Sequence, residues 1–133
     1  MSNDTPKQQT VIVVDDDVFV RLVISEYLRN CGYRVIECAN ADEALVILRN
    51  GEIKVDIVFS DVEMPGSMDG FALSTWIRKN RAGLDVILAG SVPRATDAAK
   101  GLCDEGPVPN PDQPAVIATQ IRRLMAARAA GKK

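Results

Sequence analysis

The chain has 133 residues, a length typical of one domain, and its 47% hydrophobic and 26% charged residues are ordinary for a globular protein with a core. With 16 basic and 18 acidic residues the formal net charge is −2, so no strong overall field favours nucleic acid or a membrane surface. The absence of histidine excludes a Ser-His-Asp triad, a histidine-liganded metal site and a histidine phosphocarrier.

The start of the chain and the cysteines bear on its compartment. Residues 1–9 are polar and are expected to form a disordered lead, without the apolar stretch of a secretion signal. No run approaches the roughly 18–20 apolar residues that a membrane span needs. Cys31, Cys38 and Cys103 are too far apart for a CxxC motif, and an odd, scattered set predicts buried thiols in a reducing compartment. We therefore expect a cytoplasmic protein without a membrane partner.

The first part of the chain alternates between apolar runs and a helical pattern. Residues 10–14 (TVIVV) form a continuous β-branched run, typical of a strand buried on both faces of a parallel sheet. Residues 33–38 (YRVIEC) are a second strand candidate. Between the two, apolar side chains recur at helical spacing, at Phe19, Leu22, Val23 and Tyr27. Gly32 stands where that helix is expected to end.

A second helix and a third strand follow. Asn40 and Glu43 have the spacing of a capping box, with Asn in place of Ser or Thr, so a helix is expected to begin there. It is expected to end near Gly51. Residues 56–60 (DIVFS) indicate a third strand, which stops at another aspartate, Asp61.

The second half adds further elements of both kinds. We expect, in chain order, a helix over 71–78, a strand over 85–90, a short helix over 94–102, a proline-rich stretch over 106–114 and a last helix over 116–130. Strand and helix patterns thus alternate about five times, which favours an α/β domain with a parallel sheet and helices on both faces. The domain is assigned to residues 10–128, followed by a basic tail at 129–133.

Two of the predicted strands end in acidic residues. Asp15, Asp16 and Asp17 follow the first strand, and Asp61 follows the third. At the carboxyl ends of neighbouring parallel strands these groups would repel one another by roughly 1 kcal/mol or more per pair. Mg²⁺ prefers such oxygen ligands, and a carboxylate beside it can attack phosphorus. The simpler interpretation is structural: Asp16 or Asp17 would be a helix N-cap and Asp61 a turn residue.

Three segments resemble the receiver domain of bacterial two-component response regulators. They are VIVVDDD (11–17) with Arg21 behind it, ADEAL (41–45) and DIVFSDVEMPGSMDGF (56–71). The resemblance extends over about residues 10–128. It implies a flavodoxin-like fold, with a doubly wound five-stranded parallel sheet in the order 2-1-3-4-5 and five helices.

The resemblance also implies roles for individual residues. Asp61 would be the phosphoacceptor, Asp16 would bind Mg²⁺ directly, and Asp15 would bind it directly or through water. Glu63 would offer its backbone carbonyl to the metal, and Pro65 and Gly70 would shape the loop that follows.

The second half of the family pattern is degenerate. Gly90 stands where the family has Thr or Ser, and the hydroxyl falls one residue later, on Ser91. Pro107 stands at the aromatic switch position, and Asn110 replaces the lysine that precedes a proline, here Pro111. Because proline lacks an N–H, the fifth strand is expected to be short or irregular. The metal pocket is therefore expected to survive while the switch is lost.

The leading hypothesis is a single-domain response regulator. It would accept a phosphoryl group from a sensor histidine kinase on Asp61, with Mg²⁺ as cofactor. It would then act in a phosphorelay, through contacts with a phosphotransfer protein or a downstream effector.

Two other hypotheses stay open. The first is a pseudo-receiver, a phosphorylation-independent binding or dimerisation module, which the substitutions at Gly90, Pro107 and Asn110 favour; the alanine-rich last helix could pack in a homodimer. The second is a Mg²⁺-dependent phosphohydrolase using the Asp-x-Asp spacing of Asp15 and Asp17, although the chain lacks room for a cap domain. We do not expect the protein to be an enzyme. We also expect no nucleic-acid partner, because no helix-turn-helix pattern accompanies the basic residues.

Overall fold

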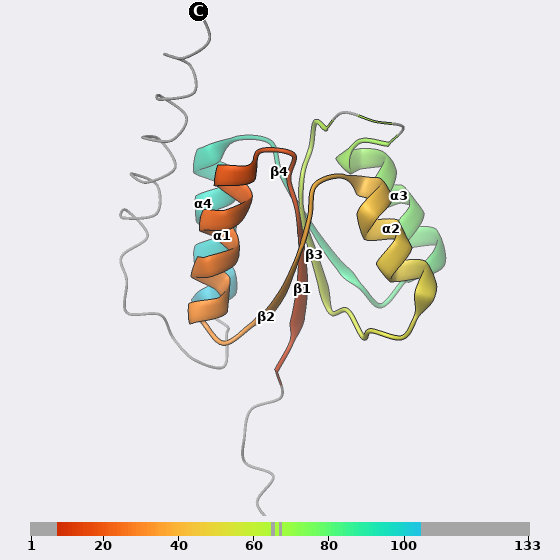
Figure 1. Ribbon diagram of the computed structural model, residues 1–133, viewed down its shortest axis with the longest axis horizontal. Coiled ribbons are helices and arrows are strands. Elements are labelled where there is room, and N and C mark those ends of the chain that lie inside the picture. Colours follow the sequence, from red (N-terminus) through yellow and green to blue (C-terminus); the bar gives the residue numbers. More distant parts are fainter. Residues whose placement is uncertain (1–7, 65, 67, 105–133) are drawn as a thin grey trace, which may run out of the picture.

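The computed structural model describes residues 8–64, 66 and 68–104, and four strands and four helices alternate along this part of the chain (Figure 1). In chain order they are β1 (Thr10–Val14), α1 (Val18–Asn30), β2 (Arg34–Cys38), α2 (Ala41–Asn50), β3 (Ile57–Asp61), α3 (Gly70–Asn80), β4 (Asp85–Ala89) and α4 (Val92–Asp104). Each expected element up to residue 104 is present, with bounds that differ by at most two residues. Within these residues, no helix has the length and apolar character needed to cross a bilayer.

The strands form one parallel sheet in the order β2-β1-β3-β4. This order confirms the α/β fold class and the flavodoxin-like arrangement of the first four strands. The expected fifth strand, with Pro107 and Asn110, lies outside the described residues, as do the last helix over 116–130 and the tail.

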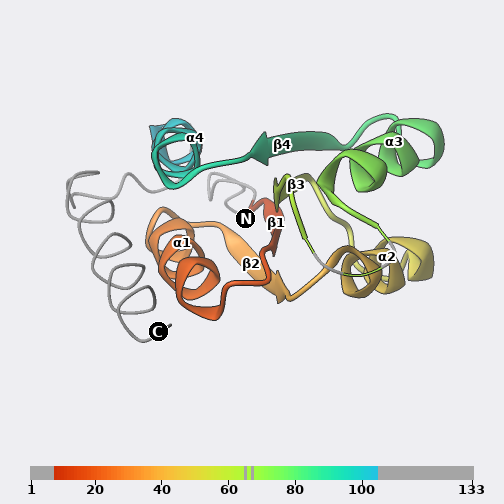
Figure 2. The ribbon, with the colours of Figure 1, turned by 90° about the horizontal axis from the view of Figure 1, so that it is seen from above.

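Helices cover both faces of the sheet (Figure 2). α1 and α4 lie on one face and α2 and α3 on the other, so two separate cores form. Alternate residues of β1 point into different cores: Val11 and Val13 face α1, whereas Ile12 and Val14 face α2. All four are almost completely buried, which confirms that β1 is a strand covered on both faces.

The buried face of α1 agrees only in part with the one that the spacing indicated, because Tyr27 is buried and Val23 partly buried as expected. Phe19 and Leu22 are 45% and 47% exposed, whereas the buried side chains are mainly Val20, Ile24, Tyr27 and Leu28. These four follow an i, i+4, i+7, i+8 pattern, the geometry of a core-facing stripe. Because apolar residues occupy two adjoining stripes of this helix, periodicity alone could not determine which of them faces the core.

The start and end of α2 follow the expected capping signals. The side-chain oxygen of Asn40 accepts a hydrogen bond from the Glu43 backbone N–H at 2.9 Å, and the Glu43 carboxylate accepts one from the Ala39 N–H at 2.6 Å. Gly51 ends the helix with φ 76°, a left-handed conformation that favours glycine. The neighbouring α3 packs beside α2, and the guanidinium of Arg49 lies 5.7 Å from the centre of the Trp76 ring.

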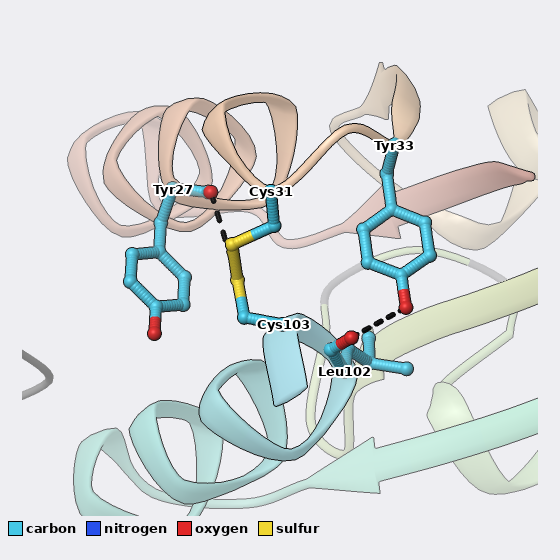
Figure 3. The surroundings of a disulfide bond; sticks show 5 residues. All are labelled: Tyr27, Cys31, Tyr33, Leu102 and Cys103. Atoms are coloured by element: carbon cyan, nitrogen blue, oxygen red, sulfur yellow. Dashed lines mark hydrogen bonds between the residues drawn. A yellow bond between two sulfur atoms is a disulfide. The ribbon is translucent and has the colours of Figure 1, made fainter. Parts of the chain in front are cut away.

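The prediction of three free thiols is wrong for two of them. Cys31 and Cys103 form a disulfide, with Cα atoms 5.2 Å apart although 72 positions separate them in the sequence. Cys38 is free, and all three residues are buried as expected. Spacing could not reveal the bond, because it depends on α1 and α4 ending side by side on one face of the sheet (Figure 3).

Candidate functional site

The acidic residues that end two different strands meet at one edge of the sheet. β1 and β3 are parallel neighbours, with Val14 opposite Ser60, so the residues that follow both strands share that edge. One carboxylate oxygen from each of Asp15, Asp16 and Asp61 lies within 4.8 Å of the other two. The structure thus brings together the three carboxylates that the sequence indicated, and we call this cluster the acidic pocket.

The three consecutive aspartates after β1 have different local contacts. Asp17 is the N-cap of α1, and its Oδ1 accepts hydrogen bonds from the Phe19 and Val20 N–H groups at 3.0 and 3.2 Å. Asp15 Oδ1 accepts the Asp17 N–H at 2.9 Å, which fixes the turn from strand to helix. The structural interpretation is therefore correct for Asp17, while Asp15 and the exposed Asp16 contribute to the pocket.

Arg21 ties this turn to the neighbouring strand. Its Nη1 donates a hydrogen bond to the Asp15 carbonyl oxygen at 2.8 Å, and its Nε lies 3.4 Å from Glu37 Oε1. Glu37 in turn pairs with Arg29, at 3.2 Å. In the sequence, only the family resemblance pointed to Arg21. Its side chain reaches the backbone beside the pocket because α1 begins directly after its N-cap, Asp17, which determines the direction in which Arg21 points. The spacing of residues in the sequence did not indicate this contact.

The surroundings of Asp61 raise the pKa of its carboxyl. Burial is the main cause that raises the pKa of its carboxyl, and the nearby Asp16 raises it further. Hydrogen bonds from the backbone N–H groups of Val62 and Glu63 oppose this rise in the pKa, the first at 2.7 Å to Oδ1. One oxygen is thus held by the backbone, in a half-buried site where a bound cation would relieve the repulsion.

The loop after Asp61 folds back closely against it. The Gly70 N–H donates to the Val62 carbonyl oxygen at 2.8 Å, and a Cβ atom at Gly70 would lie 2.2 Å from the Asp61 carbonyl oxygen. Only glycine permits this approach. The structure therefore supports the loop-shaping role expected for Gly70, whereas the role of the Glu63 carbonyl as a metal ligand stays a prediction. Pro65, expected to shape the same loop, lies outside the described residues.

The end of β4 lies beside the pocket. Ala89 is paired with Asp61, and Gly90 follows next to Val62. A Cβ atom at Gly90 would lie 3.5 Å from Val62 Cγ2, an ordinary contact, so the site has room for the missing side chain. Ser91 Oγ accepts a hydrogen bond from the Arg94 N–H at 3.3 Å and thereby caps α4. The expected hydroxyl one residue later thus contributes to the start of a helix.

A doubly wound parallel sheet with an acidic pocket at its strand tips defines a class of flavodoxin-like α/β domains. Within that class, the chain belongs to the response regulator receiver domain family, whose model matches residues 11–106. This membership confirms the resemblance seen in the sequence.

Individual relatives agree with this assignment. The two-component response regulator ARR14 of Arabidopsis thaliana is 33% identical over 102 residues, covering 77% of this chain but 26% of that protein. ARR2, another Arabidopsis response regulator, is 44% identical over 72 residues, or 54% of this chain and 11% of that protein. The chain thus spans about a quarter or less of these two relatives.

Solved receiver structures share the fold. A response regulator receiver protein from Pseudomonas putida superposes with a TM-score of 0.58 at 27% identity, covering 70% of this chain and 78% of that one. The response regulator TrrA of Thermotoga maritima, solved in complex with Mg²⁺ and BeF, gives a TM-score of 0.57 at 31% identity, with 73% and 83% covered. TrrA has also been solved in complex with the histidine kinase ThkA, and that match has a TM-score of 0.57 at 30% identity, with 64% and 71% covered.

Proposed function

We propose that Asp61 accepts a phosphoryl group from a sensor histidine kinase in the cytoplasm, with Mg²⁺ held in the acidic pocket. The observation that carries this proposal is the convergence of Asp15, Asp16 and Asp61 within 4.8 Å at the tips of two neighbouring strands. Family membership supports it, as do the TrrA complexes with Mg²⁺ and BeF and with a histidine kinase.

The donor set fits the proposed cofactor. Three carboxylates offer hard oxygen ligands, and Mg²⁺ characteristically combines one or two of these with water. Asp15, Asp16 and Asp61 would hold the ion, with the Glu63 backbone carbonyl as a further ligand. When bound, the ion offsets the repulsion among the carboxylates and neutralises negative charge on the transferring group.

The chain's own contribution to the transfer is a positioned nucleophile. The Val62 N–H holds Asp61 Oδ1, which fixes the orientation of the carboxylate. In the proposed step a carboxylate oxygen of Asp61 forms a bond to phosphorus while the phosphorus–nitrogen bond of the kinase phosphohistidine breaks. The histidine leaves with the electron pair of that bond and takes up a proton. The product is an aspartyl phosphate, which would pass to a phosphotransfer protein or alter contacts with an effector.

A second candidate is the pseudo-receiver. It is favoured by the end of β4, where Gly90 supplies no hydroxyl and the Ser91 hydroxyl caps α4. In this form the domain would bind its partner, or a second copy of itself, equally well with and without phosphate on Asp61.

The two candidates are separated by a phosphorylation assay. We expect incubation with acetyl phosphate and Mg²⁺, or with a phosphorylated kinase, to add one acid-labile phosphoryl group, detected by intact mass. Asp61→Asn should abolish the addition, whereas Asp97→Asn, the same change at an exposed position on α4, should not. No addition to the wild type under any Mg²⁺ condition would contradict phosphoacceptance and leave the pseudo-receiver.

We further propose that the chain is not an enzyme. A phosphohydrolase would release phosphate from a generic ester such as p-nitrophenyl phosphate over many turnovers. We expect the release to equal that of a buffer blank, and sustained turnover lost in Asp61→Asn would overturn this proposal.

A further inference from the structure

The disulfide joins the ends of two helices that are far apart in the sequence. Cys31 is the C-cap residue of α1, and Cys103 lies in the last turn of α4 (Figure 3). Both residues are buried, at 0% and 4% exposure, in the core between these helices and the sheet. The bond therefore fixes the end of α4 against the end of α1.

Apart from Leu102, the other described α4 side chains in this core are small. The buried residues of α4 besides Cys103 are Ala95, Thr96 and Ala99, with Leu102 partly buried. Small side chains bury little apolar area, so each gives a weak contribution to helix docking. A hydrogen bond from the Tyr33 hydroxyl to the Leu102 carbonyl oxygen adds to the contact. The covalent link thus adds to a modest set of contacts that hold this helix end in place.

The site can also accommodate the reduced state. Cys103 Sγ lies 3.8 Å from the backbone carbonyl oxygen of Tyr27, so a thiol at Cys103 would have an acceptor for its S–H (Figure 3). The surroundings are otherwise mainly apolar, and a buried cysteine thiol packs as a small apolar group. When the disulfide is reduced, the Cys103 thiol therefore has a hydrogen-bond acceptor in the Tyr27 carbonyl oxygen, and both sulfur atoms still fill the core.

The third cysteine is kept away from this pair. Cys38 belongs to the core on the opposite face of the sheet, with α2 and α3. Its side chain is 2% exposed and lies across the sheet from the disulfide, so its sulfur does not reach Cys31 or Cys103. Exchange is thus confined to Cys31 and Cys103, without reshuffling to a second pairing.

We propose that Cys31–Cys103 is a reversible thiol–disulfide exchange site that takes a dithiol reductant and controls how firmly α4 is held on α1. This proposal does not depend on phosphoryl transfer to Asp61. In a protein of a reducing compartment, where persistent disulfides are rare, such a pair would respond to the redox state.

The exchange consists of two successive substitutions, each by a thiolate at a disulfide sulfur. A thiolate of the reductant attacks Cys103 Sγ, because the last turn of a helix opens more readily than its middle. A mixed disulfide forms, and Cys31 leaves as a thiolate and takes up a proton. The second thiol of the reductant, once deprotonated, then attacks its own sulfur in the mixed disulfide and releases Cys103, which is protonated in turn. The pair gains two electrons and two protons, and the dithiol becomes a disulfide.

The test counts thiols and measures hydrogen exchange on the full chain. Alkylation after denaturation should detect one thiol in protein equilibrated with oxidised glutathione and three after treatment of the native protein with dithiothreitol. We expect the amides of the last turn of α4 to exchange at least tenfold faster in the reduced protein, with β1 unchanged. Reoxidation should restore the slow rate.

Two variants complete the test. Cys38→Ser should behave as the wild type in both redox states. Cys31→Ser combined with Cys103→Ser should show the fast exchange at α4 under all conditions, and circular dichroism should show that it keeps its helices. Three thiols after equilibration with oxidised glutathione, a bond that excess dithiothreitol leaves intact in the native protein, or equal exchange in both redox states would each overturn the proposal.

Discussion

Asp61 is the residue at which burial and like charge act together. Both raise the pKa of its carboxyl, burial more than Asp16, so folding disfavours the ionised form and stability is lost as pH rises through the raised pKa. Because Asp61→Asn removes a charge that burial and Asp16 disfavour, we expect it to raise the free energy of unfolding at neutral pH without Mg²⁺. Urea unfolding measures this difference. The difference in stability between Asp61→Asn and the wild type should vanish below pH values of about 3.9, the ordinary pKa of the carboxyl, because Asp61 is then protonated in both the folded and the unfolded state. A variant less stable than the wild type at neutral pH would contradict the electrostatic penalty.

Gly90 offers a second residue-scale prediction. A side chain fits there, because an added Cβ meets Val62 Cγ2 at 3.5 Å. The family resemblance implies that a hydroxyl at this position contacts the phosphoryl group, which stays a prediction. A hydrogen bond to a charged group contributes about 1.5–3 kcal/mol. Because a hydrogen bond made in the transition state lowers the barrier, we expect phosphorylation of Asp61 to be roughly tenfold or more faster in Gly90→Ser than in Gly90→Ala. The rate of intact-mass change with acetyl phosphate measures it, and equal rates for the two variants would refute the role of the hydroxyl.

At the scale of elements, α3 can begin beside the pocket only because its first residue is glycine. A Cβ at Gly70 would lie 2.2 Å from the Asp61 carbonyl oxygen, a backbone atom that cannot move without disturbing the end of β3. Overpacking of this kind typically costs about 1–3 kcal/mol, so Gly70→Ala should lower the free energy of unfolding by about that amount.

The chain offers a matched control for this substitution. Gly83 has no atom within 4 Å of an added Cβ, so Gly83→Ala should leave the free energy of unfolding within about 0.5 kcal/mol of the wild type. Urea unfolding of both variants measures the contrast. If Gly70→Ala were as stable as Gly83→Ala, the close fold-back of the loop would be wrong.

Element positions were largely predictable, whereas helix orientation was not. The strands of the described residues could be predicted because short β-branched runs bounded by aspartate or glycine strongly favour strands over helices. The start of α2 followed from the side chains of Asn40 and Glu43, which satisfy local backbone donors. The buried face of α1 was predicted only in part, at Val23 and Tyr27, because two apolar stripes compete. Tertiary packing selects the stripe that contains Ile24 and Leu28.

At the scale of the whole molecule, the sequence could predict long-range contacts that follow from strand order, but not those that depend on the placement of helices. Asp15, Asp16 and Asp61 converge because parallel neighbours end at one edge, and this followed once β1 and β3 were placed side by side. The Cys31–Cys103 bond depends instead on which face of the sheet α4 covers. Spacing of cysteines along the chain contains no information about that choice.

The acidic pocket as a cation site is tested most directly by titrating Mg²⁺ into the protein and measuring the heat of binding. Asp16→Asn is the sharpest variant, because Asp16 is exposed whereas Asp15 and Asp61 also accept backbone hydrogen bonds. We expect one Mg²⁺ per wild-type chain, the same binding by Asp97→Asn, and affinity weakened at least tenfold by Asp16→Asn. No measurable binding to the wild type, or equal affinity in Asp16→Asn, would contradict a metal site built from these carboxylates.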